Sequence, residues 1–284
     1  MGERVKNAQI AFFGGSFTAI DRAYMLELLE TAQSAVRAYG FSGIRCSTRP
    51  DAIDRERLDL LKAYGVTAIE LGAQSMQDTV LRRNHRGHTA QDVENAAHLI
   101  REYGFELGLQ MMTGLPGDTD EAALDTARRL IALQPDTMRI YPTIVLENTP
   151  LCDWYRAGSY IPQTLEEAVS LCARLIPEIE NAGIRLIRVG LHAGEAMENR
   201  VAGPYHPAFM ELCRSEIFLR ELTQNMDAQH LKTADVAVSP QMLSIALGQK
   251  RSNLTRLRAM GYDIEIRPEK TISGRTYRIE ESGR

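Results

Sequence analysis

The chain has 284 residues, of which 44% are hydrophobic and 25% charged, with a net charge of −4. These values predict a globular protein with one large domain, or one large and one small domain, and they exclude a chain that is basic throughout. No apolar run approaches the ~20 residues of a membrane helix, and four widely spaced cysteines predict neither disulfides nor a zinc site, so we expect a protein of the reducing cytoplasm without membrane contact.

Apolar runs alternate with amphipathic stretches over the first two thirds of the chain. Strands are predicted at 8–13, 43–46, 68–71, 106–112, 137–141 and 184–189, and helices at 22–39, 54–64, 90–103, 121–133 and 164–182. Three of these helices end in a Tyr-Gly pair, at Gly40, Gly65 and Gly104, which favours a left-handed C-cap before the next strand. Repeated strand–helix units of this kind predict an α/β fold with a parallel sheet.

The end of the chain has a different pattern. Residues 195–230 are mainly polar and helical in character. After them we expect a strand at 234–238, a helix at 240–247, a turn at 248–251, a helix at 252–260, and strands at 263–267 and 276–280. We therefore predict a large domain at 1–228 and a small α+β domain at 229–284.

Polar and glycine-rich turns follow the predicted strands, where parallel sheets build their binding sites. The paired glycines Gly14 and Gly15 can bring backbone N–H groups to an anionic end of a ligand. Glu70, Gln74, Ser75 and Gln110 can hydrogen-bond ribose hydroxyls or an amino group, and the stretch 112–115 can pack on a flat base. This constellation predicts a nucleoside with a charged tail as the ligand.

Six segments in this order resemble the radical S-adenosylmethionine superfamily, and in particular its elongator catalytic-subunit-like branch. They are Gly14-Gly15-Ser16-Phe17-Thr18, Glu70-Leu71-Gly72-Ala73-Gln74-Ser75, Arg86-Gly87-His88-Thr89, Gly114-Leu115-Pro116-Gly117, Arg139-Ile140-Tyr141-Pro142 and Ala202-Gly203-Pro204-Tyr205-His206-Pro207. The resemblance covers roughly residues 8–215. It implies an open, partial TIM-type barrel of parallel strands with outer helices.

The resemblance also implies which residues bind the cofactor S-adenosylmethionine. The glycine pair would contact its methionine end, the turns after Cys46 and Leu71 would contact the methionyl and ribose parts, and 110–116 with Tyr141 would border the adenine. The resulting candidates for cofactor binding are Gly14, Gly15, Ser16, Thr18, Ser47, Arg49, Glu70, Gln74, Ser75, Gln110, Met112, Leu115 and Tyr141.

One departure from the family is large. The family holds a [4Fe–4S] cluster on a CxxxCxxC-type loop upstream of the paired glycines, and thiolates are the usual cluster ligands. Here no cysteine precedes Gly14, and no two of Cys46, Cys152, Cys172 and Cys213 are closer than 20 residues. We therefore expect no metal ligands in this chain, and we interpret it as a radical-SAM protein that lacks the first strand and the cysteine loop and is inactive as written.

The sequence gives only a weak indication for a further set of residues that could contact the substrate. His85, Arg86 and His88 belong either to a substrate-facing cluster or to a solvated helix approach, and His206 follows the last predicted barrel strand. Arg139 lies in a strand that should be buried, so it needs a partner, either Glu70 or the cofactor. No residue is assigned a catalytic role.

The segment Ser244–Leu254 resembles the helix–turn–helix edge of a KH domain, which clamps a nucleic-acid backbone with a GXXG loop. Arg251 replaces the second glycine here. With Lys250 it makes a local basic patch that can contact RNA phosphates, and the alternative is an ordinary solvated face.

The family implies an enzyme that generates a 5′-deoxyadenosyl radical to modify tRNA or a related RNA, with a flavodoxin or ferredoxin as electron donor in the full-length form. The alternative is a cluster-free protein that binds a nucleoside or RNA. A porphyrin-pathway radical enzyme is a third hypothesis, but the Gly-Gly-Ser-Phe-Thr turn and the Leu-Pro-Gly element resemble the elongator branch more closely.

Overall fold

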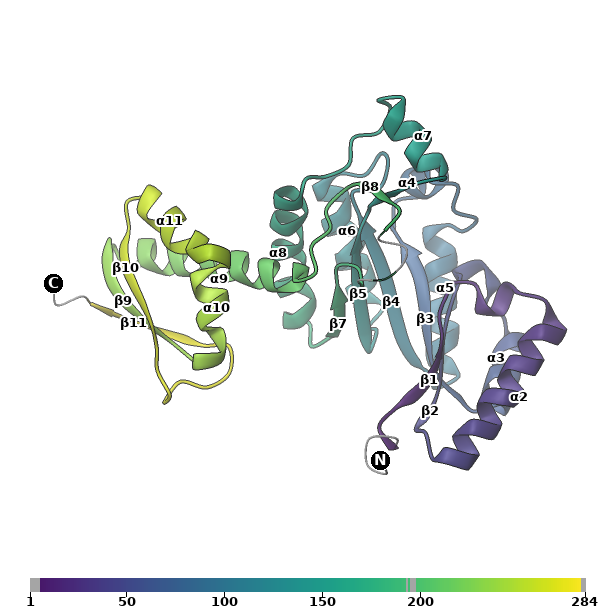
Figure 1. The fold of residues 1–284 in the computed structure, drawn as a ribbon. Coiled ribbons are helices and arrows are strands. Elements are labelled where there is room, and N and C mark those ends of the chain that lie inside the picture. The colour runs from purple at the N-terminus through teal and green to yellow at the C-terminus, as the bar shows by residue number, and fades with distance from the viewer. Residues whose placement is uncertain (1–5, 193, 195–197, 282–284) are drawn as a thin grey trace. The chain divides into compact units, whose positions relative to one another are not determined.

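The structure is a computed structural model that describes residues 6–192, 194 and 198–281. A six-stranded parallel sheet forms an open half-barrel, with its strands in the order β1-β2-β3-β4-β5-β7 (Figure 1). The strands are β1 (Gln9–Phe12), β2 (Gly43–Thr48), β3 (Val66–Gln74), β4 (Glu106–Thr113), β5 (Thr137–Pro142) and β7 (Arg185–Val189). The α/β class and the open, parallel half-barrel are therefore as predicted.

Outer helices connect the strands. They are α2 (Arg22–Tyr39), α3 (Arg55–Ala63), α4 (Asp78–Arg83), α5 (Ala90–Glu102), α6 (Asp120–Ala132), α7 (Pro150–Arg156) and α8 (Leu165–Asn181). Side-chain caps start several of them, among them a capping box in which Thr89 and Asp92 each accept from the other's backbone N–H. The glycines after α2, α3 and α5 all have positive φ, as the Tyr-Gly pattern predicted.

The ends of the strands differ most from expectation. β3 continues to Gln74 and carries a register shift between Gly72 and Gln74, where a turn was predicted after Leu71. Gln74 has a φ of 63°, so this irregularity turns its side chain out of the regular alternation of the strand. A small antiparallel ribbon of β6 (Val145–Leu146) and β8 (Arg200–Ala202), and the helix α7, were not predicted.

The chain divides into two compact units. One comprises 1–164 and 175–205, and the other comprises 165–174 and 206–284. The predicted boundary at 228 coincides with the end of α9 (Phe209–Ala228), a helix that belongs with the second unit.

The second unit combines α9 with a three-stranded sheet in the order β10-β9-β11. Its elements are β9 (Thr233–Val238), α10 (Leu243–Leu247), α11 (Ser252–Ala259), β10 (Asp263–Pro268) and β11 (Tyr277–Glu281). β9 is parallel to β10 and antiparallel to β11, and Leu222, Met226 and Val236 are fully buried in the core between helices and sheet. In the described part of the chain, no helix is long and apolar enough to cross a membrane.

Candidate functional site

A cavity of about 520 Å³ opens where the half-barrel strands end. Eight of the predicted cofactor-binding residues line it: Gly14, Gly15, Ser16, Ser47, Arg49, Gln74, Gln110 and Tyr141. Arg86 and His88, predicted on the substrate side, line the same cavity. Parallel strands bring their carboxyl ends to one edge, which is why residues as far apart in the sequence as Gly14 and Tyr141 meet here.

The turn after β1 forms one wall of the cavity, and its backbone there is not covered by side chains. Gly14 and Gly15 have φ values of 124° and 76°, and a Cβ at either position would meet no atom within 4 Å. Glycine is therefore required by the backbone conformation rather than by crowding. Phe13, 69% exposed, precedes the pair, and the guanidinium of Arg139 lies 5.8 Å from the centre of its ring.

Two polar atoms at this cavity lack a hydrogen-bond partner within the described protein. Ser47 is 4% exposed, and its Oγ makes no hydrogen bond to the described residues. The Oε1 of Gln74 also has no hydrogen-bond partner there. Buried polar groups are nearly always satisfied, so an orphaned pair at a cavity indicates a place for ligand atoms.

Two arginines give the cavity a positive side. Arg49 is held by Asp51, with Nε donating to Oδ1 at 2.9 Å. Arg86 has no carboxylate partner among the described residues, and its one recorded contact is Nη2 to the Met112 Sδ at 3.6 Å. Partial desolvation at the cavity and the nearby Arg49 both lower the pKa of Arg86. An anionic group would relieve this repulsion between two cations.

His88 faces the cavity as a neutral imidazole. It is 6% exposed, and its Nε2 lies 3.1 Å from the Ala73 carbonyl oxygen, which can only accept a hydrogen bond. Nε2 therefore carries the proton, and Nδ1 keeps its lone pair. Burial lowers the pKa of His88, against an opposing effect of the bond to Ala73.

Glu70 anchors a charged network inside the half-barrel. It is 1% exposed and accepts from Arg45 Nη1 at 2.9 Å, from Arg139 Nη2 at 2.9 Å and from Gln110 Nε2 at 2.7 Å. Burial alone would raise the pKa of Glu70, but these donors and charges hold it below the usual value. The predicted partnership of Arg139 with Glu70 is confirmed.

This network reaches the cavity through Gln110, which both lines the cavity and donates to Glu70. Gly108 allows it to form, because a Cβ there would lie 2.8 Å from the Glu70 Cγ. Glu70 is thus a positioning residue for Gln110 rather than part of the cavity wall.

Besides Glu70, four further predicted cofactor residues lie outside the wall. The Thr18 hydroxyl bonds to the Ala52 carbonyl at 2.6 Å, and Ser75 Oγ accepts from the Gln77 N–H. Leu115 is 6% exposed within the core, and the Met112 Sδ accepts from Arg86 Nη2 at 3.6 Å. Their contacts shape the loops around the cavity.

Sequence reasoning did not select three wall residues, Phe13, Gly72 and Gly87, whereas His85 was considered with Arg86 and His88 and also lines the cavity. The one signal for them was their position beside selected residues, since each adjoins or lies within a motif. The remaining predicted residues, His206, Lys250 and Arg251, line a different cavity in the second unit.

The thiols do not form a metal centre. Cys46, Cys152, Cys172 and Cys213 are all buried and free, and burial raises the pKa of Cys46 to about 12. Among the described residues, no group of three or more His, Cys, Asp or Glu side chains could hold a metal ion. The described residues therefore offer no set of thiolates for an iron–sulfur cluster.

Comparison with known proteins identifies the family and the relatives of this chain. Family models described as the radical SAM superfamily and the Radical_SAM C-terminal domain match residues 2–130 and 135–218. The tRNA uridine(34) acetyltransferase of Dehalococcoides mccartyi is 29% identical over 182 residues, covering 57% of this chain and 40% of that protein. Human Elongator complex protein 3 is 30% identical over 200 residues, covering 62% and 37%. The chain thus spans about two fifths of the length of these curated relatives.

Solved structures show the same fold. An archaeal Elp3 from Methanocaldococcus infernus with an N-terminal deletion superimposes with a TM-score of 0.65 at 22% identity, over 80% of this chain and 55% of that one. Coproporphyrinogen III oxidase from Escherichia coli, a radical SAM enzyme, gives a TM-score of 0.50 at 21% identity, over 62% and 41%. With two models of one superfamily matching successive segments, the chain belongs to the radical SAM superfamily, and its relatives are Elongator-type proteins.

Proposed function

We propose that the half-barrel cavity binds S-adenosylmethionine and that the chain takes part in radical-type modification of tRNA. The observation that carries the proposal is the pair of orphaned polar atoms, Ser47 Oγ and Gln74 Oε1, beside two guanidinium groups at the strand ends. A zwitterionic nucleoside needs such a mixture of neutral acceptors, donors and positive charge.

Each part of the cofactor has a candidate partner. Arg86 has no carboxylate partner among the described residues, so its guanidinium is the group that would hold the methionyl carboxylate. Ser47 and the Gly14–Gly15 backbone would take the rest of the methionyl end, Gln74 and Gln110 the ribose hydroxyls, and Tyr141 the adenine face.

The tRNA substrate is inferred from the relatives and from the second unit. One relative is named for uridine 34 of tRNA. Lys250 and Arg251 lie in the loop that resembles the GXXG element of KH domains, and both are exposed. We infer that they contact RNA phosphates.

Calorimetry with S-adenosylmethionine tests the cavity. We expect weak binding, with a Kd on the order of 0.1 mM, because the described residues include no group that could hold a metal to chelate the methionyl end. Arg86→Ala should weaken binding at least about tenfold, the effect of losing one charge-assisted hydrogen bond. Arg82→Ala, an exposed arginine on α4, is the matched control. No binding by the unaltered chain, or equal effects of the two substitutions, would refute the assignment.

A cluster-free nucleoside- or RNA-binding protein is the second candidate, favoured by the burial of all four thiols. Anaerobic reconstitution with iron and sulfide separates the two. We expect no stoichiometric cluster absorbance from this chain alone, and about four irons bound per chain would contradict that expectation.

A further inference from the structure

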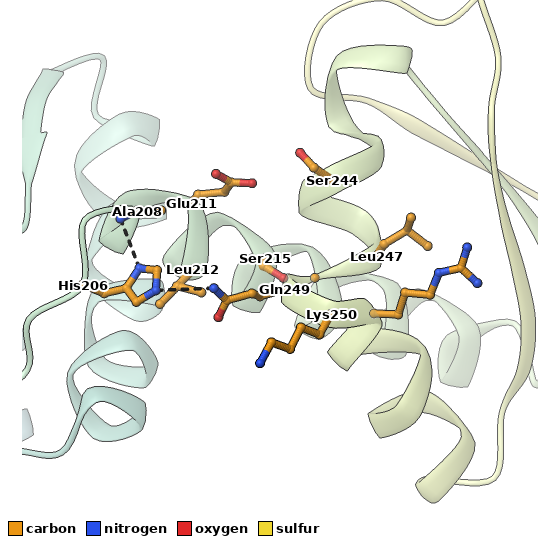
Figure 2. Close-up of a pocket in the computed structure, with 11 residues that line it drawn as sticks. His206, Ala208, Glu211, Leu212, Ser215, Ser244, Leu247, Gln249 and Lys250 are labelled. Carbon is orange, nitrogen blue, oxygen red and sulfur yellow. Dashed lines mark hydrogen bonds between the residues drawn. The ribbon is translucent and has the colours of Figure 1, made fainter.

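A second cavity, of about 360 Å³, lies within the second unit between the start of α9 and the loop that joins α10 to α11 (Figure 2). This volume is at the lower end of the range for small-ligand sites and is suited to one planar ring system with its substituents. Leu212 and Leu247 give it apolar surface, while His206 and Gln249 supply a polar edge.

The charged side chains at this cavity have no partner in the described protein. Glu211, Lys250 and Arg251 all line it and are exposed, and no ion pair or side-chain hydrogen bond engages their charged ends. Figure 2 shows Glu211 leaving α9 on the side that faces Ser244 of α10, with Lys250 extending from the opposite loop. The cavity thus offers a carboxylate on one wall and two cations on the other.

The wall that bears the cations is held in place. Asn253 is 1% exposed, and its Nδ2 donates to the Ser215 Oγ at 3.0 Å and to the Ala246 carbonyl at 3.1 Å, so it ties α11 to α9 and α10. His206 is oriented as well, because its Nδ1 accepts from the Ala208 N–H at 3.1 Å. A site whose walls are fixed by their own hydrogen bonds loses little entropy on binding.

We propose that this cavity takes one unstacked base of single-stranded RNA, with guanine preferred, while Lys250 and Arg251 hold the adjoining phosphates. The inference rests on the proposed RNA contact of the same loop and adds to it a base-reading pocket.

The base preference follows from the Glu211 carboxylate, which only accepts hydrogen bonds. Guanine presents N1–H and N2–H side by side to its two oxygens. Uracil presents one N–H between two carbonyl oxygens, which the carboxylate repels. The Leu212 and Leu247 surfaces cover the ring faces, as apolar side chains do for splayed-out bases.

Fluorescence anisotropy with the full chain tests the proposal. The probes are 5′-labelled decamers of oligouridine RNA that carry guanine or uracil at one central position. We expect the guanine probe to bind about tenfold more tightly, the discrimination of one good bidentate contact. Glu211→Gln, an isosteric change at an exposed position, should reduce this preference to about twofold, because it weakens the guanine probe and removes the repulsion of the uracil carbonyl oxygens.

A double substitution, Lys250→Ala with Arg251→Ala, should weaken both probes equally and reduce the slope of log K against log salt by about 1.4, or 0.7 per phosphate contact. Lys270→Ala and Asp263→Asn, exposed charges that do not line the cavity, are the matched controls and should change neither result.

The two proposals fail in different ways. A double variant with unchanged affinity would assign the cavity to an occupant other than nucleic acid, which overturns both. A double variant that weakens binding while the probes show no base preference, or a preference that survives Glu211→Gln, would overturn only the base pocket.

Discussion

At the scale of single residues, Glu70 is the charge on which the half-barrel interior depends. It is buried and accepts hydrogen bonds from Arg45, Arg139 and Gln110. Removing one partner of a buried ion pair leaves the others desolvated and uncompensated, which costs far more than the loss of an exposed pair.

Glu70→Gln should therefore lower the free energy of unfolding by about 3–5 kcal/mol, measured by urea denaturation at pH 7. Glu106→Gln is the control, because Glu106 bonds to Arg45 at 2.8 Å but its side chain is 26% exposed, and about 1 kcal/mol is expected. Since the pKa of Glu70 is lowered on folding, its contribution is present above its unfolded pKa of about 4.3 and fades as the pH falls through the folded value. Equal losses for the two variants would contradict this account.

His88 is a base and Glu70 an acid, but the lowered pKa of each makes the half-barrel less stable as the pH falls. Because burial lowers the pKa of His88, the folded chain binds fewer protons than the unfolded one just below pH 6.5, so stability falls as the pH falls through that window. Melting temperatures at pH 7.5, 6.5 and 5.5 test this. The chain should lose stability relative to His88→Gln as the pH falls, whereas His98→Gln, on the exposed face of α5, should leave the profile unchanged.

At the scale of elements, the loop between α10 and α11 carries backbone strain. Lys250 and Arg251 have φ values of 53° and 62°, in the left-handed region that favours glycine, and Arg251 stands where the resembling KH motif has its second glycine. Gly248 has a φ of 72°, and a Cβ on it would lie 2.5 Å from the Ser252 Oγ.

Arg251→Gly should consequently raise the free energy of unfolding by a few tenths to about 1 kcal/mol, read from thermal unfolding followed by circular dichroism. The same substitution in a right-handed helix, Arg258→Gly in α11, should lower it by up to about 1 kcal/mol. Gly248→Ala should be more damaging, by about 1–3 kcal/mol. A destabilising Arg251→Gly would show that the loop is not strained in this way.

At the scale of the whole molecule, each unit has its own core. Leu222 is fully buried among the helices and sheet of the second unit, and Leu109 is fully buried in β4 of the half-barrel. Cavity-forming substitutions act through the surroundings of the deleted atoms, so their effects should remain within one unit.

Hydrogen exchange followed by mass spectrometry measures this. Leu222→Ala should lower local stability by about 2–5 kcal/mol and speed exchange in β9, β10 and α9 while the half-barrel strands keep their protection. Leu109→Ala should give the reverse pattern. Faster exchange throughout the chain in both variants would mean that the two units unfold as one.

Periodicity predicted most of the architecture, because helices and strands bury faces at different repeats and the Tyr-Gly stops mark where each helix ends. The strand order was not predicted, and it is the order that right-handed connections between successive βα units produce. The bulge at Gln74 and the β6–β8 ribbon escaped prediction, since a register shift and a pairing between residues more than 50 positions apart depend on neighbouring strands rather than on local sequence.

The motifs at the strand ends could be recognised from the sequence alone, because glycine pairs and polar residues that follow apolar runs have few purely structural roles. They identified the superfamily and most of the cavity wall. Only the tertiary structure decided which polar atoms remain unpaired, since Ser47 and Thr18 are both small hydroxyl residues beside strands, yet one faces the cavity and the other bonds to Ala52. It also brought Glu211 of α9 to the loop of Lys250, because only packing makes neighbours of residues on separate elements.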